Sequence, residues 1–255
     1  MAAFPLMLPG TSRPPKLVVF DLDHTLIACD ATILWTEFLY EKKIVTDPIW
    51  RQYDRDMVKS YAKGVLDIRD FCRKHSGAFR SIPEEKLHAL AQEFAKKKIA
   101  PLIFPDGKKW AKNALQANIP ACVLSASAAF IVKPIAKLFG LTDAMGIELA
   151  FKDGFCTGEI VGIPTFQEGK VERLSERLAE AGIGFEDVLF FTDSRNALPL
   201  AERAGYTVCV NPDAVLESAA RKNGWKVAEW KLSLRTQMTA QVDAKGVPET
   251  QTVRS

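Results

Sequence analysis

The sequence contains no uninterrupted hydrophobic run of the roughly 18 residues that a membrane-spanning helix needs. Its opening segment, MAAFPLMLPG, has no basic stretch, and prolines interrupt its apolar residues, which does not fit a secretion signal. We therefore expect a cytoplasmic protein that has no membrane partner.

Closely spaced cysteines are also missing. The five cysteines are scattered and form no C-x-x-C motif, which argues against a disulfide framework and a zinc cage. The sequence also has no large excess of one charge, because it contains 34 Lys and Arg and 31 Asp and Glu. A net charge of +3 over 255 residues gives no reason to expect nucleic acid as a partner.

The composition that is present, 47% hydrophobic and 25% charged, is typical of a globular protein. The length allows either one large domain or a core with an inserted module. Short apolar runs predict buried strands, and helical patterns follow them along the chain. The strands are expected at 17–20, 121–124, 188–191 and 206–210, and the helices at 128–139, 170–181, 198–204 and 214–223. This alternation predicts an α/β fold, a Rossmann-like parallel sheet with helices on both faces.

Two segments interrupt the alternation. Residues 28–102 hold amphipathic helical patterns and no convincing strand, which predicts an all-helical insert after the first strand. Residues 146–161 predict a β-hairpin that turns at Lys152-Asp153-Gly154. The expected organisation is an α/β core of 16–27 and 103–232, a helical cap of 28–102, and flexible termini of 1–15 and 233–255.

A pair of aspartates follows the first predicted strand. Asp21 and Asp23 are two residues apart in extended chain, so their side chains point the same way. They stand at the carboxyl end of a buried parallel strand, where open α/β sheets place ligands. A solvated loop or a helix cap would explain an isolated D-x-D. The apolar strand before this pair and Thr25 after it make the pattern more specific.

Three further residues follow in a characteristic order. Ser125 ends the second predicted strand, Lys170 opens a helix, and Asp193 follows a later strand. With the D-x-D-x-T segment, these residues resemble the four motifs of the haloacid dehalogenase (HAD) superfamily over residues 17–212. The helical insert resembles the C1-type cap of its phosphoserine-phosphatase-like IB hydrolases.

This resemblance implies a Mg²⁺-dependent phosphomonoesterase that hydrolyses a small phosphorylated metabolite through a covalent aspartyl phosphate. Asp21 would be the nucleophile, and Asp23 would act as general acid and then as general base. The carbon–halogen hydrolases of the superfamily lack the second aspartate, which favours phosphoryl transfer.

The resemblance also implies the phosphate and metal ligands. Ser125 and Lys170 would bind the phosphoryl oxygens, with Ser127 as the second candidate for the hydroxyl. Magnesium would be held by the carboxylates of Asp21 and Asp193 and by the backbone carbonyl of Asp23, since hard oxygen ligands suit this ion.

The last motif departs from the family pattern. Thr192 replaces the usual glycine, and Ala197 replaces a second acid. We therefore expect weaker Mg²⁺ affinity or lower turnover, with catalysis retained. Thr25 and Asn196 are expected to have supporting roles, Thr25 in ordering the loop and Asn196 in positioning metal or water.

Substrate specificity is expected to come from the cap. Asp30 stands where phosphoserine phosphatases place an acid that meets the substrate amine, and an N-cap of the helix at 31 is the alternative reading. Arg73 and His75 lie near the position of a carboxylate-binding arginine in those enzymes. His75 falls at the matching site, which argues against phosphoserine itself as the substrate.

Two alternative functions remain open at this point. The same aspartate could transfer phosphate to an acceptor other than water. Alternatively, Ala197 could mark a weakened family member that binds a ligand or a partner without turnover. The expected partner is a small phosphorylated substrate, and both a monomer and a homodimer are compatible with the sequence.

Overall fold

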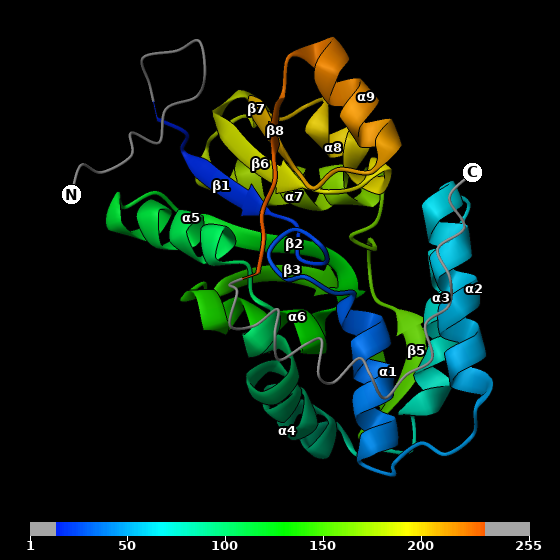
Figure 1. The fold of residues 1–255 in the computed structure, drawn as a ribbon. Coiled ribbons are helices and arrows are strands. Elements are labelled where there is room, and N and C mark those ends of the chain that lie inside the picture. Colours follow the sequence, from blue (N-terminus) through cyan, green and yellow to red (C-terminus); the bar gives the residue numbers. More distant parts are fainter. Residues whose placement is uncertain (1–13, 233–255) are drawn as a thin grey trace.

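The computed structural model of the chain describes residues 14–232 (Figure 1). The predicted flexible termini, 1–15 and 233–255, therefore lie outside the described residues, apart from residues 14 and 15. Within residues 14–232, no helix combines the length and the apolarity that a membrane crossing requires.

The core is one parallel sheet of six strands, which confirms the predicted fold class. In sheet order the strands are β3 (Asp143–Ile147), β2 (Ala121–Ala128), β1 (Leu17–Phe20), β6 (Val188–Thr192), β7 (Tyr206–Val210) and β8 (Lys226–Ala228). The bounds of β1 and β7 agree with the prediction. β2 is longer than predicted, and the two edge strands β3 and β8 were not predicted.

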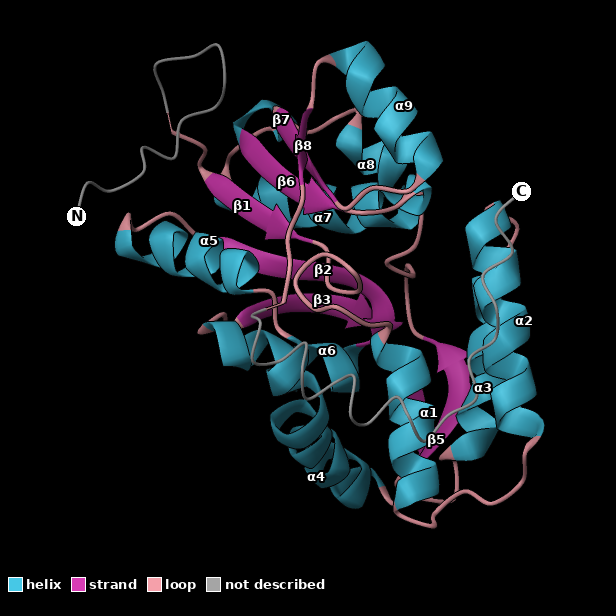
Figure 2. Ribbon diagram, viewed as in Figure 1, coloured by secondary structure: helices cyan, strands magenta, loops and turns pink. Residues whose placement is uncertain are grey.

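Helices cover both faces of this sheet (Figure 2). Val18 and Phe20 of β1 pack into the hydrophobic cluster that includes residues of α5 and α6. Leu17 and Val19 point to the other face and pack with residues of α7 and α8. The bounds are α5 (Pro105–Gln116), α6 (Ala129–Ala136), α7 (Glu168–Ala181), α8 (Leu198–Ala201) and α9 (Ala214–Asn223). The sheet is therefore buried on both sides, as a parallel sheet requires.

A helical insert leaves the core after β1 and returns before β2, as expected for a C1 cap. Its helices are α1 (Ala31–Glu41), α2 (Ile49–Lys63), α3 (Ile68–His75) and α4 (Glu84–Phe94), and a π-helical turn (Ala95–Ile99) follows α4. Trp35 of α1 is fully buried and contacts the ring of Phe94 within the cap and the ring of Phe130 in core helix α6. These aromatic contacts attach the cap to the core.

The predicted hairpin is present as β4 (Leu149–Lys152) and β5 (Phe155–Ile160). Its turn residues, Asp153 and Gly154, both have positive φ (52° and 78°), as a two-residue hairpin turn demands. The hairpin starts later than residue 146 because Gly146 belongs to β3. Arg73 of α3 forms an ion pair with Glu159 of β5 at 3.0 Å. Since β5 packs against α3 (Figure 1), we propose that the cap consists of residues 28–102 together with this hairpin.

Candidate active site

The centre of the site is a buried ion pair between Asp21 and Lys170. Asp21 directly follows β1, and Lys170 lies in the first turn of α7. Lys170 Nζ is 2.5 Å from Asp21 Oδ2, and the two side chains are only 2% and 6% exposed. The backbone N–H of Leu22 donates to the other carboxylate oxygen at 2.9 Å. Each buried group thus has a partner of opposite charge, and the two contacts fix the orientation of the Asp21 carboxylate.

Thr192 is a site residue that the sequence reasoning did not assign. It ends β6 beside β1, and its hydroxyl donates to Asp21 Oδ2 at 3.2 Å. The side chain is fully buried. The only signal in the sequence was the replacement of the family's glycine, and no spacing rule connects residue 192 with Asp21.

Asp23 lies in a network of hydrogen-bond donors. The Ala31 N–H donates to its Oδ1 at 2.7 Å, while the hydroxyls of Ser125 and Ser127 donate to its Oδ2 at 3.2 and 2.9 Å. Burial and then the charge of Asp30 raise the pKa of Asp23 to about 7. A carboxyl group with this pKa can carry a proton near neutral pH, as a general acid must.

Ser125 and Ser127, the two candidates for the phosphate-binding hydroxyl, both contact Asp23. Ser125 and Ser127 lie on the same side of β2, and the Ser127 N–H donates to Ser125 Oγ at 3.0 Å. Ser127 lines the cavity next to Asp21 and Asp23, whereas Ser125 is completely buried behind it. Ser127, the second candidate, is thus the hydroxyl with direct access to the cavity.

Asp193 completes the set of carboxylates. It follows β6 and accepts a hydrogen bond from the Thr25 hydroxyl at 3.2 Å. The ordering role of Thr25 stays a prediction. Burial and the nearby charge of Asp21 raise the pKa of Asp193 well above its usual value. A cation bound between Asp193 and Asp21 would offset this unfavourable interaction.

The donor set suits a hard ion that keeps water ligands. Within the described residues, no group of three or more His, Cys, Asp or Glu side chains stands ready to enclose a metal. Two carboxylates and one backbone carbonyl would leave several positions to water and substrate, which is how Mg²⁺ is usually bound.

The residues around the replaced acid have other contacts. Asn196 Nδ2 donates to the backbone carbonyl of Tyr61 in the cap at 3.0 Å, and its Oδ1 accepts from Gln167 at 3.2 Å. Ala197 is fully buried and packs in a hydrophobic cluster with Leu200 of α8. The Asn196 amide thus contacts the cap in this structure, and the side chain of Ala197 contributes apolar packing.

The structure brings one of the three cap candidates to the site. Asp30 caps α1, where its Oδ1 accepts from the Ile33 N–H at 2.9 Å, and its side chain also lines the cavity. Both readings of Asp30 are therefore compatible. Burial raises its pKa. Arg73 is exposed and paired with Glu159, and neither it nor His75 lines this cavity.

His75 lies deep in the cap instead. Its Nε2 is 2.9 Å from the Thr36 hydroxyl and 3.3 Å from Asp54 Oδ1. The side chains of His75 and Asp54 are each 6% exposed. These contacts join α1, α2 and α3 and give His75 a place in the packing of the cap.

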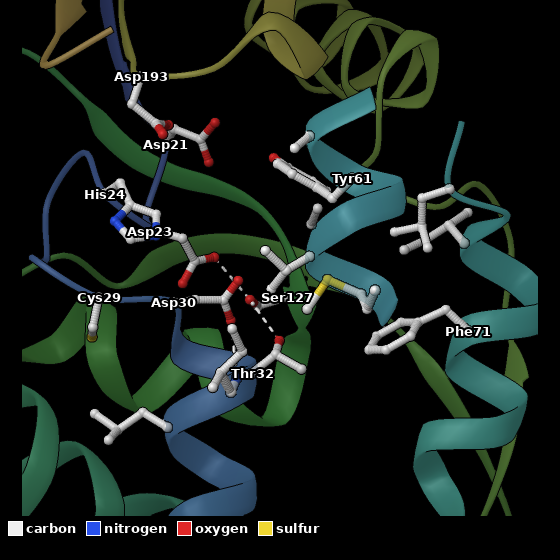
Figure 3. A pocket seen from close by; sticks show the side chains of 18 of the residues that line it. Asp21, Asp23, His24, Cys29, Asp30, Thr32, Tyr61, Phe71, Ser127 and Asp193 are labelled. Carbon is white, nitrogen blue, oxygen red and sulfur yellow. Dashed lines mark hydrogen bonds between the residues drawn. The ribbon is translucent and has the colours of Figure 1, made fainter. Parts of the chain in front are cut away.

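A cavity of about 400 Å³ lies between the core and the cap. Asp21, Asp23 and Asp193 line its core end, and Phe71 of the cap lies on the opposite side (Figure 3). Further apolar residues of the cap line it as well, among them Ile33, Met57 and Leu66. No arginine or lysine is among the described residues that line it. A ligand that reaches the carboxylates would thus place its remaining atoms against an apolar wall.

Comparison with known proteins agrees with this geometry. A family model for haloacid dehalogenase-like hydrolases matches residues 18–202. This chain belongs to that family. A histidinol-phosphatase of Neisseria meningitidis is 34% identical to this HAD hydrolase over 220 residues, which cover 85% of this chain and 99% of that protein.

Solved structures show the same fold. A Bordetella pertussis protein described as of unknown function has a TM-score of 0.75 and 31% identity, and the match covers 83% of this chain and 96% of that one. A phospho-aspartyl intermediate analogue of phosphoserine phosphatase has a TM-score of 0.63 and 21% identity over 89% and 99% of the two chains. The predicted class, a HAD-like phosphatase of the phosphoserine-phosphatase-like branch, is confirmed.

The contact between Thr192 and Asp21 leads to a first prediction. Thr192→Val removes the hydroxyl and keeps the branched shape, so Asp21 Oδ2 loses one donor. A hydrogen bond to a charged group contributes about 1.5–3 kcal/mol, and kcat should therefore fall about 10- to 100-fold. Steady-state hydrolysis of p-nitrophenyl phosphate measures this. Thr192→Ser should stay near the wild type, and a fully active Thr192→Val enzyme would contradict the assigned contact.

A second prediction concerns the missing acid. Ala197→Asp should lower the Mg²⁺ concentration that gives half-maximal activity, because it restores a carboxylate in the loop that carries Asp193. A magnesium titration of the hydrolysis rate measures the change, and Ala197→Asn controls for the added volume. If both variants and the wild type have the same magnesium dependence, the lost acid does not explain metal affinity here. Thermal melts of both variants show whether the polar side chain is accommodated.

Proposed function

We propose that this chain is a Mg²⁺-dependent phosphomonoesterase that works through a phosphoaspartate on Asp21. The observation that carries the proposal is the buried Lys170–Asp21 ion pair, with the Asp23 carboxyl two residues further along the chain and turned into the same cavity. A carboxylate paired with a lysine, beside a second carboxyl that can carry a proton, is the pair that two-step phosphoryl transfer needs.

The two steps follow from these residues. An Asp21 oxygen attacks the phosphorus of the ester, the bond to the leaving oxygen breaks, and Asp23 gives that oxygen its proton. Asp23 then takes a proton from the water that attacks the aspartyl phosphate, which releases inorganic phosphate and restores Asp21. A positioned acid and base of this kind contributes about 10²–10⁴-fold to the rate.

Side chains of the site and the magnesium ion would together stabilise the negative charge of the phosphate. Lys170 and the hydroxyl of Ser127 or Ser125 would bind phosphoryl oxygens, where charge develops in the transition state. Asp21, Asp193 and the backbone carbonyl of Asp23 would hold the magnesium ion, which supplies positive charge against the phosphate and the carboxylates when it is bound.

The cavity favours an amine-bearing substrate without a carboxylate. Asp30 is an acid on the cavity wall that could meet a cation, whereas Glu37, also on the wall, is already paired with Arg51 through hydrogen bonds of 2.7 Å. A carboxylate would find no arginine or lysine among the described lining residues. Histidinol phosphate has an amine and no carboxylate, whereas phosphoserine has both. The first is therefore the better model substrate.

The test is phosphate release from histidinol phosphate, O-phosphoserine and p-nitrophenyl phosphate, each with Mg²⁺ or with EDTA. We expect histidinol phosphate to give at least a tenfold higher kcat/KM than phosphoserine, and we expect EDTA and Asp21→Asn each to abolish release. Release that survives both changes would rule out the mechanism. An enzyme that prefers phosphoserine would rule out the assigned substrate class.

Matched variants isolate the role of Asp30. Asp30→Asn keeps a residue that caps helices well and removes the charge. It should lower kcat/KM for histidinol phosphate about tenfold or more, the loss of a charge-assisted contact, and change p-nitrophenyl phosphate hydrolysis little. Asp67→Asn is the control, because Asp67 caps α3 in the same cap and does not line this cavity. Equal effects of Asp30→Asn on both substrates would contradict the amine contact.

A further inference from the structure

Tyr61 extends from the cap into the catalytic cavity. It lies near the end of α2, its ring packs against Phe166 with 5.8 Å between centroids, and its hydroxyl oxygen is 3.2 Å from Ser194 Oγ. It lines the same cavity as Asp21 and Asp193. In Figure 3 the phenol points from α2 across the cavity toward these two carboxylates.

The core holds this part of the cap in place. Asn196 Nδ2 donates to the Tyr61 carbonyl at 3.0 Å, and Gln167 Nε2 donates to the Gly64 carbonyl at 3.3 Å. Gln167 also donates to Asn196 Oδ1 at 3.2 Å, so the two amides support each other. Gln167 directly precedes α7, which carries Lys170, and Asn196 lies in the 3-10 turn Arg195–Ala197 just after Asp193. Hydrogen bonds thus connect the end of α2, where Tyr61 lies, to the segments that carry Lys170 and Asp193.

The backbone conformation of Gln167 is unusual and depends on the hydrogen bonds of its side chain. Its φ of 48° and ψ of −122° lie in a region that residues with a side chain rarely adopt. Surrounding contacts must hold such a conformation, and the two hydrogen bonds of the Gln167 amide are among them. The strained residue directly precedes α7, which carries Lys170.

The chemistry of the phenol suits a hydrogen-bond donor. Burial raises the pKa of Tyr61 well above its usual value, and the charges of Asp21 and Asp193 act in the same direction. The hydroxyl therefore keeps its proton at neutral pH. In the Tyr61–Ser194 contact either oxygen can be the donor, and when Ser194 donates, the phenolic proton is free to point into the cavity.

We propose that Tyr61 is a catalytic residue supplied by the cap, and that its hydroxyl donates a hydrogen bond to a phosphoryl oxygen of the substrate bound at Asp21. This inference rests on the proposed function, since it requires a phosphoryl group in front of Asp21. That group would fill the space that the phenol faces, beside Asp21 and Asp193, and its oxygens would accept the hydrogen bond from the phenol. Asn196 and Ser194 act as positioning residues through Tyr61.

The first test compares two tyrosines of the cap. Tyr61→Phe removes the hydroxyl and leaves the ring against Phe166, and Tyr40→Phe removes a hydroxyl that donates to the Asp47 carbonyl elsewhere in the cap. With p-nitrophenyl phosphate we expect Tyr61→Phe to lower kcat about 10- to 100-fold while KM changes little. Tyr40→Phe should behave like the wild type. A Tyr61→Phe enzyme with unchanged kcat would overturn the proposal.

Inhibition by orthovanadate distinguishes a direct contact of Tyr61 with the phosphoryl group from a purely structural role of this residue. Vanadate resembles the five-coordinate phosphorus of the transition state, so its inhibition constant should rise in Tyr61→Phe in parallel with the loss of kcat. Unchanged vanadate affinity in Tyr61→Phe would overturn the contact with the phosphoryl group. If the wild type binds vanadate but releases phosphate from no ester, the proposed phosphatase function fails as well, and the two failures can be told apart.

A double-mutant cycle tests the positioning role of Asn196. Asn196→Ala should lower kcat in the wild-type background, because it frees the backbone of Tyr61. In the Tyr61→Phe background the same change should have little further effect, since the hydroxyl that Asn196 positions is already absent. Additive losses in kcat would show that Asn196 does not act through Tyr61.

Discussion

The ion pair between Lys170 and Asp21 allows three aspartates to share one cleft. Burial penalises each carboxylate, and like charges raise one another's pKa, as the raised values of Asp23 and Asp193 show. Lys170, at 2.5 Å from Asp21, supplies an opposing charge that is buried with them. The nucleophile thus has a lysine as its direct counter-ion, whereas burial raises the pKa of Asp23 and of Asp193. This contrast between neighbouring carboxyls is what separates a nucleophile from an acid.

The fold produces this arrangement through parallel pairing. β1 lies between β2 and β6, so the ends of these strands present Asp21, the two serines and Asp193 at one edge of the sheet. The cap closes over that edge and supplies mostly apolar side chains, with Asp30, Thr32, Glu37 and Tyr61 as polar exceptions. The core thereby determines the reaction class, and the cap is where the choice among phosphate esters has to be made.

Sequence patterns predicted what local physics determines. The buried strand Leu17–Phe20 and the aspartates after it follow from a short apolar run and from alternation along extended chain. Edge strand β8 has only three residues, two of them exposed, so it leaves no such run. Tyr61 and Thr192 were missed because their roles depend on which surfaces meet in three dimensions. For the same reason Arg73, close to the expected position in sequence, lies away from the cavity.

In the proposed mechanism, the phosphoryl group is transferred to the Asp21 carboxylate before water releases it. Rapid acid quench of the enzyme during turnover, followed by borohydride reduction and peptide mass spectrometry, measures this directly, because an aspartyl phosphate is reduced to homoserine. We predict homoserine at position 21 in samples quenched during turnover, and none in samples without substrate. Homoserine at another aspartate, or unmodified Asp21 in an enzyme that is actively releasing phosphate, would contradict the account.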